Sequence, residues 1–201
     1  MKIRKVKIKQ LLKLNLLKSK VYEQPIKKMK FDNLIDVNLN QIITDIKKVL
    51  QIVFHYHQVE KRILFVGLPH KLESRINQST KHLAIPKSFD IQGVISNQNY
   101  KSLKTSKASS QIQSKEYSNF LLPKLTKKLD LIIVFEHDKN KTILSESKAI
   151  RIPVMFFGTD SDLQNKAFYN VEGNFKNILT ASDKTMFFVG LNFIFKNLKK
   201  K

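Results

Sequence analysis

The fold is indicated most clearly by the run Leu129-Asp-Leu-Ile-Ile-Val-Phe135. Two runs of the same character are Arg62-Ile-Leu-Phe-Val-Gly67 and Ile152-Pro-Val-Met-Phe-Phe157. Each run is short, almost wholly apolar, and rich in branched and aromatic side chains, which is typical of strands buried on both faces of a parallel sheet. A fourth, shorter strand is predicted at Tyr169-Asn-Val171, with Gly173 ending it.

Apolar residues at helical spacing predict helices between these strands. A long amphipathic helix is predicted over residues 39–59. Further helices are predicted by the spacing of Leu72, Ile76, Ser79 and Leu83, over residues 141–150, and over residues 186–198. Strands that alternate with helices need crossover connections, so we expect an α/β fold with a mostly parallel sheet covered on both faces.

The chain is strongly basic, with 37 Lys and Arg against 16 Asp and Glu and a formal net charge of +21. The excess is concentrated in residues 1–30, in residues 98–128 and in the C-terminal tail. A compact chain with this charge repels itself, and a polyanionic partner would neutralise it. The composition, rich in Lys, Ile, Asn and Phe, is also that of an AT-rich genome, such as an organelle genome.

The composition excludes several kinds of site and segment and disfavours others. The absence of cysteine excludes disulfides, thiolate metal sites and a cysteine nucleophile. No apolar stretch is long enough for a membrane span. The first twenty residues carry basic side chains and no acid, which permits a mitochondrial presequence. We favour a basic arm that is retained in the mature protein.

No motif for catalysis or cofactor binding is complete. The turn Val66-Gly-Leu-Pro-His70 has one glycine where phosphate loops need several, so it predicts a plain strand-to-helix turn. His55 and His57 would point to different sides of a helix, which favours surface histidines over a metal site. Four acids follow predicted strands and offer a possible magnesium site, although carboxylates in turns more often cap backbone amides: Glu136, Asp138, Asp160 and Asp162.

Taken in order, these segments resemble the bacterial and organellar family of small-ribosomal-subunit protein 2. Ile63-Leu-Phe-Val-Gly67 is similar to that family's ILFVG strand, and Gly93-Val-Ile-Ser-Asn97 to the end of its WLGGTLTN segment. The segment 129–135, with Glu146 after it, is similar to PDLLFV and the KEA helix that follows. Ile152 to Asp162 resembles GIPVIALVDTNSDP, and Val171-Glu-Gly-Asn174 stands where the family has IPGND. The resemblance covers roughly residues 35–195.

The chain departs from the family in three places. The family's N-terminal GHxxxxxNPKM region has only a weak counterpart here, with residues 25–29 as its remnant. The family's RWLGG is replaced by Phe89-Asp-Ile-Gln-Gly93. A polar insertion at about 98–122 stands where the family has a long helical hairpin, which is therefore largely lost. These departures and the composition fit a divergent mitochondrial member, encoded in the organelle genome.

The resemblance implies a flavodoxin-like domain over residues 35–201, preceded by a basic extension over residues 1–34. It further implies a structural component of the small ribosomal subunit in the mitochondrial matrix. Such a protein binds small-subunit ribosomal RNA and neighbouring ribosomal proteins during translation, catalyses nothing, and needs no cofactor, metal, membrane or small-molecule substrate.

The basic regions supply the expected contacts with RNA. Lysine and arginine neutralise phosphates and position the protein, while folded RNA shape and unpaired bases supply specificity. Tyr22, Phe31 and Tyr100 are candidates for stacking on bases. The expected RNA-binding residues are Lys2, Arg4, Lys5, Lys7, Lys9, Lys27, Lys28, Lys30, Lys101 and Lys104. Two alternatives remain: a metal-dependent α/β hydrolase or nuclease that acts on a polyanion, and a non-ribosomal RNA-binding module.

Overall fold

The computed structural model describes residues 2–19, 22, 32–86, 95, 127–135, 140–175 and 185–196. Five strands form one sheet in the order β2-β1-β3-β4-β5, and each neighbouring pair is parallel. The strands are β1 (Ile63–Val66), β2 (Leu83–Ile85), β3 (Leu131–Phe135), β4 (Val154–Gly158) and β5 (Tyr169–Glu172). This is the strand order of flavodoxin-like doubly wound folds. The predicted fold class is therefore confirmed.

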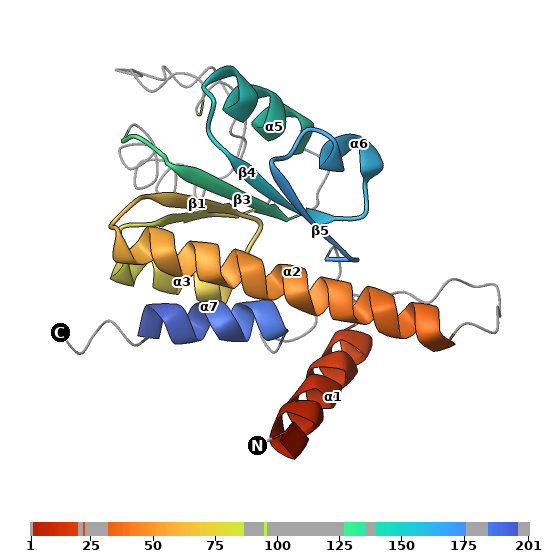
Figure 1. Cartoon of the computed structure of the whole chain (residues 1–201). Helices are drawn as coiled ribbons and strands as arrows, with labels where there is room; N and C mark the ends of the chain where they lie inside the picture. The colour runs from red at the N-terminus through yellow and green to blue at the C-terminus, as the bar shows by residue number, and fades with distance from the viewer. Residues whose placement is uncertain are drawn as a thin grey trace.

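Helices cover both faces of the sheet. Figure 1 shows α2, α3 and α7 on one face and α5 and α6 on the other. The helices are α1 (Lys2–Lys18), α2 (Asp32–Gln58), α3 (His70–Ser79), α5 (Asn140–Ala149), α6 (Ser161–Gln164) and α7 (Met186–Lys196). The chain runs from β1 outward to β2, and from β3 outward to β5 in the opposite direction. Because crossovers are right-handed, the two directions place their helices on opposite faces.

The sheet separates two hydrophobic cores, and alternate residues of β1 to β4 enter different ones. Ile63 and Phe65 of β1 join the core beneath α2, α3 and α7. Leu64 and Val66 join the core beneath α5 and α6. This alternation explains why β1 to β4 are apolar almost throughout: both faces of these strands are buried, whereas β5 at the sheet edge is only partly buried.

Phenylalanine dominates the larger core. The Phe157 ring, wholly buried, stacks on Phe135 with a centroid distance of 4.8 Å and an interplanar angle of 27°. It meets Phe175 edge-on at 5.1 Å and Phe187 at 4.7 Å. These three partners come from β3, from the segment after β5 and from α7. Phe157 therefore joins the sheet to the last helix of the chain.

The prediction that Leu83 continues a helix from Leu72 is wrong, because α3 ends at Ser79 and Leu83 begins β2. The polypeptide becomes extended at Thr80, the C-cap residue. Asn77 of α3 binds the backbone of Ala84 in β2. Its side-chain nitrogen donates to Ala84 O at 2.8 Å, and its side-chain oxygen accepts from Ala84 N at 2.7 Å. Asn77 thus occupies the backbone groups that an edge strand otherwise leaves unpaired.

Two glycines have the backbone conformations that their predicted turns require. Gly67 has φ of 85° and its amide donates to Ile85 O at 2.9 Å, so the chain turns sharply from β1 toward α3. Gly173 has φ of 151° directly after β5. Both conformations are readily adopted only by glycine. The predicted plain turn at Gly67 and the end of the strand at Gly173 are confirmed.

Helix α1 forms within the predicted basic extension and is anchored at its C-terminal end. Leu16 is 1% exposed and packs in the core with residues of α2 and α7. The side-chain oxygen of Asn15 accepts a hydrogen bond from Met186 N at 3.2 Å. Helix α7 in turn lies against α2, where Gly190 leaves room for Leu50: a Cβ there would be 2.6 Å from Leu50 Cδ1. The polar insertion expected at about 98–122 lies outside the described residues.

Candidate nucleic-acid interface

Helix α1 carries basic residues along its whole length and no acidic residue. The side chains of Lys7, Lys9 and Lys18 are exposed. Figure 1 shows α1 extending away from the sheet, with the N-terminus at its far end. A projecting helix with exposed cations is well suited to reach a polyanion that is too large to enter a cleft.

The first turn of α1 concentrates positive charge. Lys2, Arg4 and Lys5 lie in this turn and no acid accompanies them. The helix dipole adds about half a positive charge at the same end, so these cations destabilise the free helix. A bound phosphate would relieve that repulsion. The sequence position of these residues therefore favours an anionic partner at the tip of α1.

Several acidic side chains make hydrogen bonds within the fold. Asp45 accepts from the Tyr169 hydroxyl at 2.8 Å, and burial together with this bond raises the pKa of Tyr169 to about 12. Asp130 accepts from Arg62 N at 2.9 Å and Glu146 accepts from Ile95 N at 3.1 Å. These carboxylates stabilise turns and contacts between distant segments.

The structure describes part of the predicted set of RNA-binding residues. Lys2, Arg4, Lys5, Lys7 and Lys9 belong to α1, and the side chains of the last two are exposed. The remaining predicted residues lie outside the described part of the chain: Lys27, Lys28, Lys30, Lys101 and Lys104. Tyr22 is half-buried against the larger core, so stacking on a base would use only part of its ring. Phe31 and Tyr100 are not described.

The carboxyl edge of the sheet, where α/β folds bind ligands, shows ordinary turns. Helix α3 begins at His70 directly after the Gly67 turn. At the end of β4, Asp160 Oδ1 accepts from Asp162 N at 3.0 Å, so the Asp160 carboxylate caps a backbone amide of the turn, as predicted. Glu136 and Asp138 lie outside the described residues. Within the described ranges, no group of three histidines or acids is placed to hold a metal ion.

A cavity of about 260 Å³ opens beside the ends of β4 and β5. Its polar lining comes from acids and amides: Asn38, Gln41, Asp45, Glu172 and Asn174. Carboxylates at this position repel phosphate, so the cavity is unsuited to a nucleotide or to the RNA backbone. The electropositive surface of α1 is the better candidate for contact with nucleic acid.

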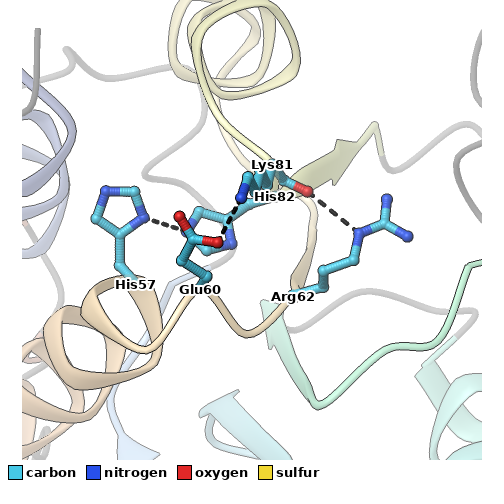
Figure 2. Close-up of polar contacts among 5 residues, drawn as sticks. All are labelled: His57, Glu60, Arg62, Lys81 and His82. Carbon is cyan, nitrogen blue, oxygen red and sulfur yellow. Dashed lines mark hydrogen bonds and ion pairs between the residues drawn. The ribbon is translucent and has the colours of Figure 1, made fainter.

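A histidine pair joins the end of α2 to β2 (Figure 2). His57 Nδ1 and His82 Nε2 are 2.6 Å apart, and the Phe195 ring of α7 packs on both imidazoles. His82 is 2% exposed. His57 is half-buried, so the expectation of a surface histidine is only partly met there, whereas His55 is exposed as expected.

The hydrogen bonds determine which nitrogens carry protons. Ile63 N donates to His82 Nδ1 at 3.3 Å, so this nitrogen is unprotonated and the proton of neutral His82 is on Nε2. His82 Nε2 then donates to His57 Nδ1. Neither facing nitrogen retains a lone pair for a metal, because one carries the proton and the other accepts it. The pair is a structural link between α2, β1 and β2.

Burial keeps both imidazoles neutral. The pKa of His82 is lowered to about 3, first by burial and then by His57 and Arg62, and the pKa of His57 is lowered by burial. Around the pair, Glu60 and Lys81 form an exposed ion pair at 2.6 Å, and Arg62 Nε donates to Lys81 O at 3.3 Å. Figure 2 shows these charged groups beside the histidine pair.

Glu73 is a buried carboxyl group whose pKa is raised, whereas burial lowers the pKa of the two histidines. It is 2% exposed, and its Oε1 atom has no hydrogen-bond partner in the described part of the structure. Burial raises the pKa of Glu73 to about 7. An ionised Glu73 therefore costs stability, since a buried charge without a partner loses its hydration.

We expect the stability effects of His82 and Glu73 to oppose each other between pH 5 and 7. The unfolded chain protonates His82 near pH 6.5 and the folded chain does not, so stability falls by about 2 kcal/mol from pH 7 to pH 5. The pKa of Glu73 is higher in the folded than in the unfolded chain, so the protonated group stabilises the folded state. This contribution is lost as the pH rises through 7, and it decreases by about 2 kcal/mol from pH 5 to pH 7.

Glu73→Gln separates the two effects. We expect the variant to lose about 2 kcal/mol between pH 7 and pH 5, with His57 adding in the same direction, whereas the wild type changes little. Urea unfolding at pH 5, 6 and 7 measures this difference. Parallel pH profiles of variant and wild type would show that Glu73 ionises normally in the folded protein.

The sequence patterns did not indicate the roles of three residues: His82, Glu73 and Lys18. His82 and Glu73 lie in no recognisable motif, and their importance comes from burial that only the packed fold reveals. Exposed Lys18 was not predicted as an RNA-binding residue, although its place within the predicted basic extension could have indicated it.

None of the helices in the described part of the chain has both the length and the apolar composition needed to cross a bilayer. A scan against models of protein families and a search of curated proteins found no match for this chain.

Proposed function

We propose that this chain is a structural component of the small ribosomal subunit, a divergent mitochondrial member of the small-ribosomal-subunit protein 2 family. It binds small-subunit ribosomal RNA and neighbouring ribosomal proteins, and it takes part in translation without catalysing a reaction. The ordered sequence similarities over residues 35–195 support this proposal. The five-stranded parallel sheet is compatible with the fold that the resemblance implies.

One observation carries the proposal: a doubly wound sheet without a phosphate loop after β1 is joined to a projecting helix that carries many basic residues and no acid. Nucleotide-binding members of such folds need glycines that let the backbone approach the phosphates. Here the turn after β1 has Gly67 alone and leads directly into α3. The electropositive surface lies on α1, outside the sheet's usual ligand site. This arrangement favours a scaffold that binds a polyanion over an enzyme with a buried substrate.

In the proposed mechanism α1 acts as an electrostatic anchor. Its lysines and arginine replace the counterions of RNA phosphates, and the released ions provide much of the binding free energy. Such contacts position the protein without reading sequence. Specificity comes from the shape of the folded RNA and from contacts with neighbouring proteins. The packing of Leu16 in the larger core holds α1 on the α/β domain.

Fractionation of the lysate tests the assignment. We expect this chain to migrate with the small ribosomal subunit on a sucrose gradient of mitochondrial lysate and to be present in stoichiometric amount by mass spectrometry. Dissociation of subunits with EDTA serves as the control, because a true subunit protein then leaves the monosome fraction and stays with the small subunit. Migration as a free protein, or with a non-ribosomal RNA, would contradict the assignment and favour the alternative RNA-binding module.

A further inference from the structure

The outer surface of α1 exposes large aliphatic side chains among its lysines. Ile8 is 54% exposed, Leu11 65%, Leu14 52% and Leu17 36%. We call these four residues the α1 ridge. They are distinct from Leu12 and Leu16, which face α2 and α7. Exposed apolar side chains at consecutive turns of one helix are typical of a surface that another molecule covers.

The spacing of the α1 ridge favours a helix as its partner. Its members recur every third residue, and such i±3 rows run obliquely across a helix surface, at about 45° to the axis. Rows of this kind fit into the grooves of a second helix. A flat bilayer would instead contact a straight stripe parallel to the helix axis. The geometry therefore points to a protein helix rather than to a lipid surface.

The charge around the α1 ridge determines what kind of helix fits. Lys7 lies four residues before Leu11, and Lys18 lies four residues after Leu14, so each lysine neighbours a ridge residue on the helix surface. No acid interrupts α1. A second copy of this chain would bring its own net charge of +21 and would be repelled. An acidic partner would complement the lysines.

RNA is a poor cover for these residues. Its accessible surface is dominated by phosphates and sugars, which gain little from contact with leucine. Apolar burial contributes about 25 cal/mol per Å², and only an apolar partner surface provides it. The ridge and the N-terminal cations of α1 can thus serve different partners, since Leu11, Leu14 and Leu17 lie closer to the anchored end.

We propose that the α1 ridge binds an acidic amphipathic helix of another protein. Leucines of the partner would interleave with Leu11 and Leu14, and its carboxylates would pair with Lys18 and compete with RNA phosphates for Lys7. The inference deepens the proposed function, on which it rests for the source of the partner, a neighbouring protein in the particle.

The test uses the full chain and two synthetic peptides. One is an amphipathic helix of leucine and glutamate, and the other has the same composition in an order that removes the apolar stripe. We expect the first peptide to bind, and Leu11→Gln/Leu14→Gln to weaken that binding about tenfold or more. Because both leucines are exposed, the variant should fold normally, which circular dichroism checks. Phe168→Gln is the matched control, since Phe168 is 80% exposed and lies in the α6–β5 turn.

Three outcomes would overturn the inference. Equal binding of the two peptides would show that charge alone is recognised. Unchanged peptide binding by the double variant would exclude the ridge. Ridge-dependent binding to vesicles of phosphatidylserine and phosphatidylcholine, without peptide binding, would identify a membrane surface instead. RNA binding and gradient migration are measured on the same variants: their failure, with ridge-dependent peptide binding intact, would reject the proposed function and leave the helix site standing.

Discussion

We expect a roughly thousandfold loss of affinity for small-subunit ribosomal RNA when the basic residues in the first half of α1 are replaced together by glutamine. The variant changes Lys2, Arg4, Lys5, Lys7 and Lys9. Each cation that contacts a phosphate releases condensed counterions, and the contributions combine over the five residues. Glutamine retains helix propensity and removes the repulsion at the N-terminus of α1, so the helix itself should persist.

The salt dependence of binding distinguishes specific phosphate contacts from general attraction. If all five residues contact phosphates, the slope of log K against log salt should become less steep by about 3.5 to 4.5. A matched control replaces five exposed lysines outside the basic regions, which lowers the net charge equally: Lys47, Lys61, Lys141, Lys148 and Lys166. Filter binding at several salt concentrations measures both variants. Equal losses in the two variants would contradict a particular role for α1.

Substitution is a cleaner test than removal of residues 1–30. Leu16 is buried in the larger core, and Asn15 accepts a hydrogen bond from the amide of Met186. Deletion would expose the sides of α2 and α7 that α1 covers. A loss of RNA binding in a truncated protein would therefore combine lost charge with disturbed packing.

We expect Phe157→Ala to destabilise the protein by about 4 kcal/mol, the largest single effect in the core. Phe157 is wholly buried and its ring contacts Phe135, Phe175 and Phe187 at centroid distances near 5 Å. Truncation removes apolar burial, leaves a cavity and abolishes the edge-on and stacked aromatic contacts. Because domains have about 5–15 kcal/mol of stability in total, the variant should approach unfolding at physiological temperature.

Urea unfolding gives the magnitude, provided that the m-value stays constant. Phe168→Ala is the control, since Phe168 is 80% exposed and its truncation should change stability by less than about 0.5 kcal/mol. Phe157→Leu should fall between the two, because leucine fills part of the cavity. A Phe157→Ala variant within about 1 kcal/mol of the wild type would show that the aromatic cluster repacks without Phe157.

The strands show where sequence reasoning works well. Ile63 to Val66 and Leu131 to Phe135 are apolar on both faces, and only burial on both sides of a sheet accommodates such runs. Strand β2 was missed because three residues are too few to show a period, and Leu83 happens to continue the spacing of α3. What defines β2 is a long-range contact, the pairing of Asn77 with both backbone groups of Ala84.

The candidate interface divides in the same way. Its charge could be predicted, because lysines in a run without acids are visible in the sequence itself. The helical form of residues 2–18 could not, since α1 is apolar on more than one side and has no clear amphipathic period. Its anchoring depends on the pocket that α2 and α7 provide for Leu16.

By itself the sequence determined the class of the fold, the parallel arrangement of its main strands and the excess of positive charge. These properties follow from local composition and from the spacing of apolar residues, which short segments carry independently of their neighbours. Tertiary structure alone decided that His82 pairs with His57, that Glu73 is buried, and that one side of α1 is covered while the α1 ridge remains exposed. Those outcomes depend on which distant segments come into contact. Burial and hydrogen bonding of this kind arise from tertiary contacts and cannot be read from one segment alone.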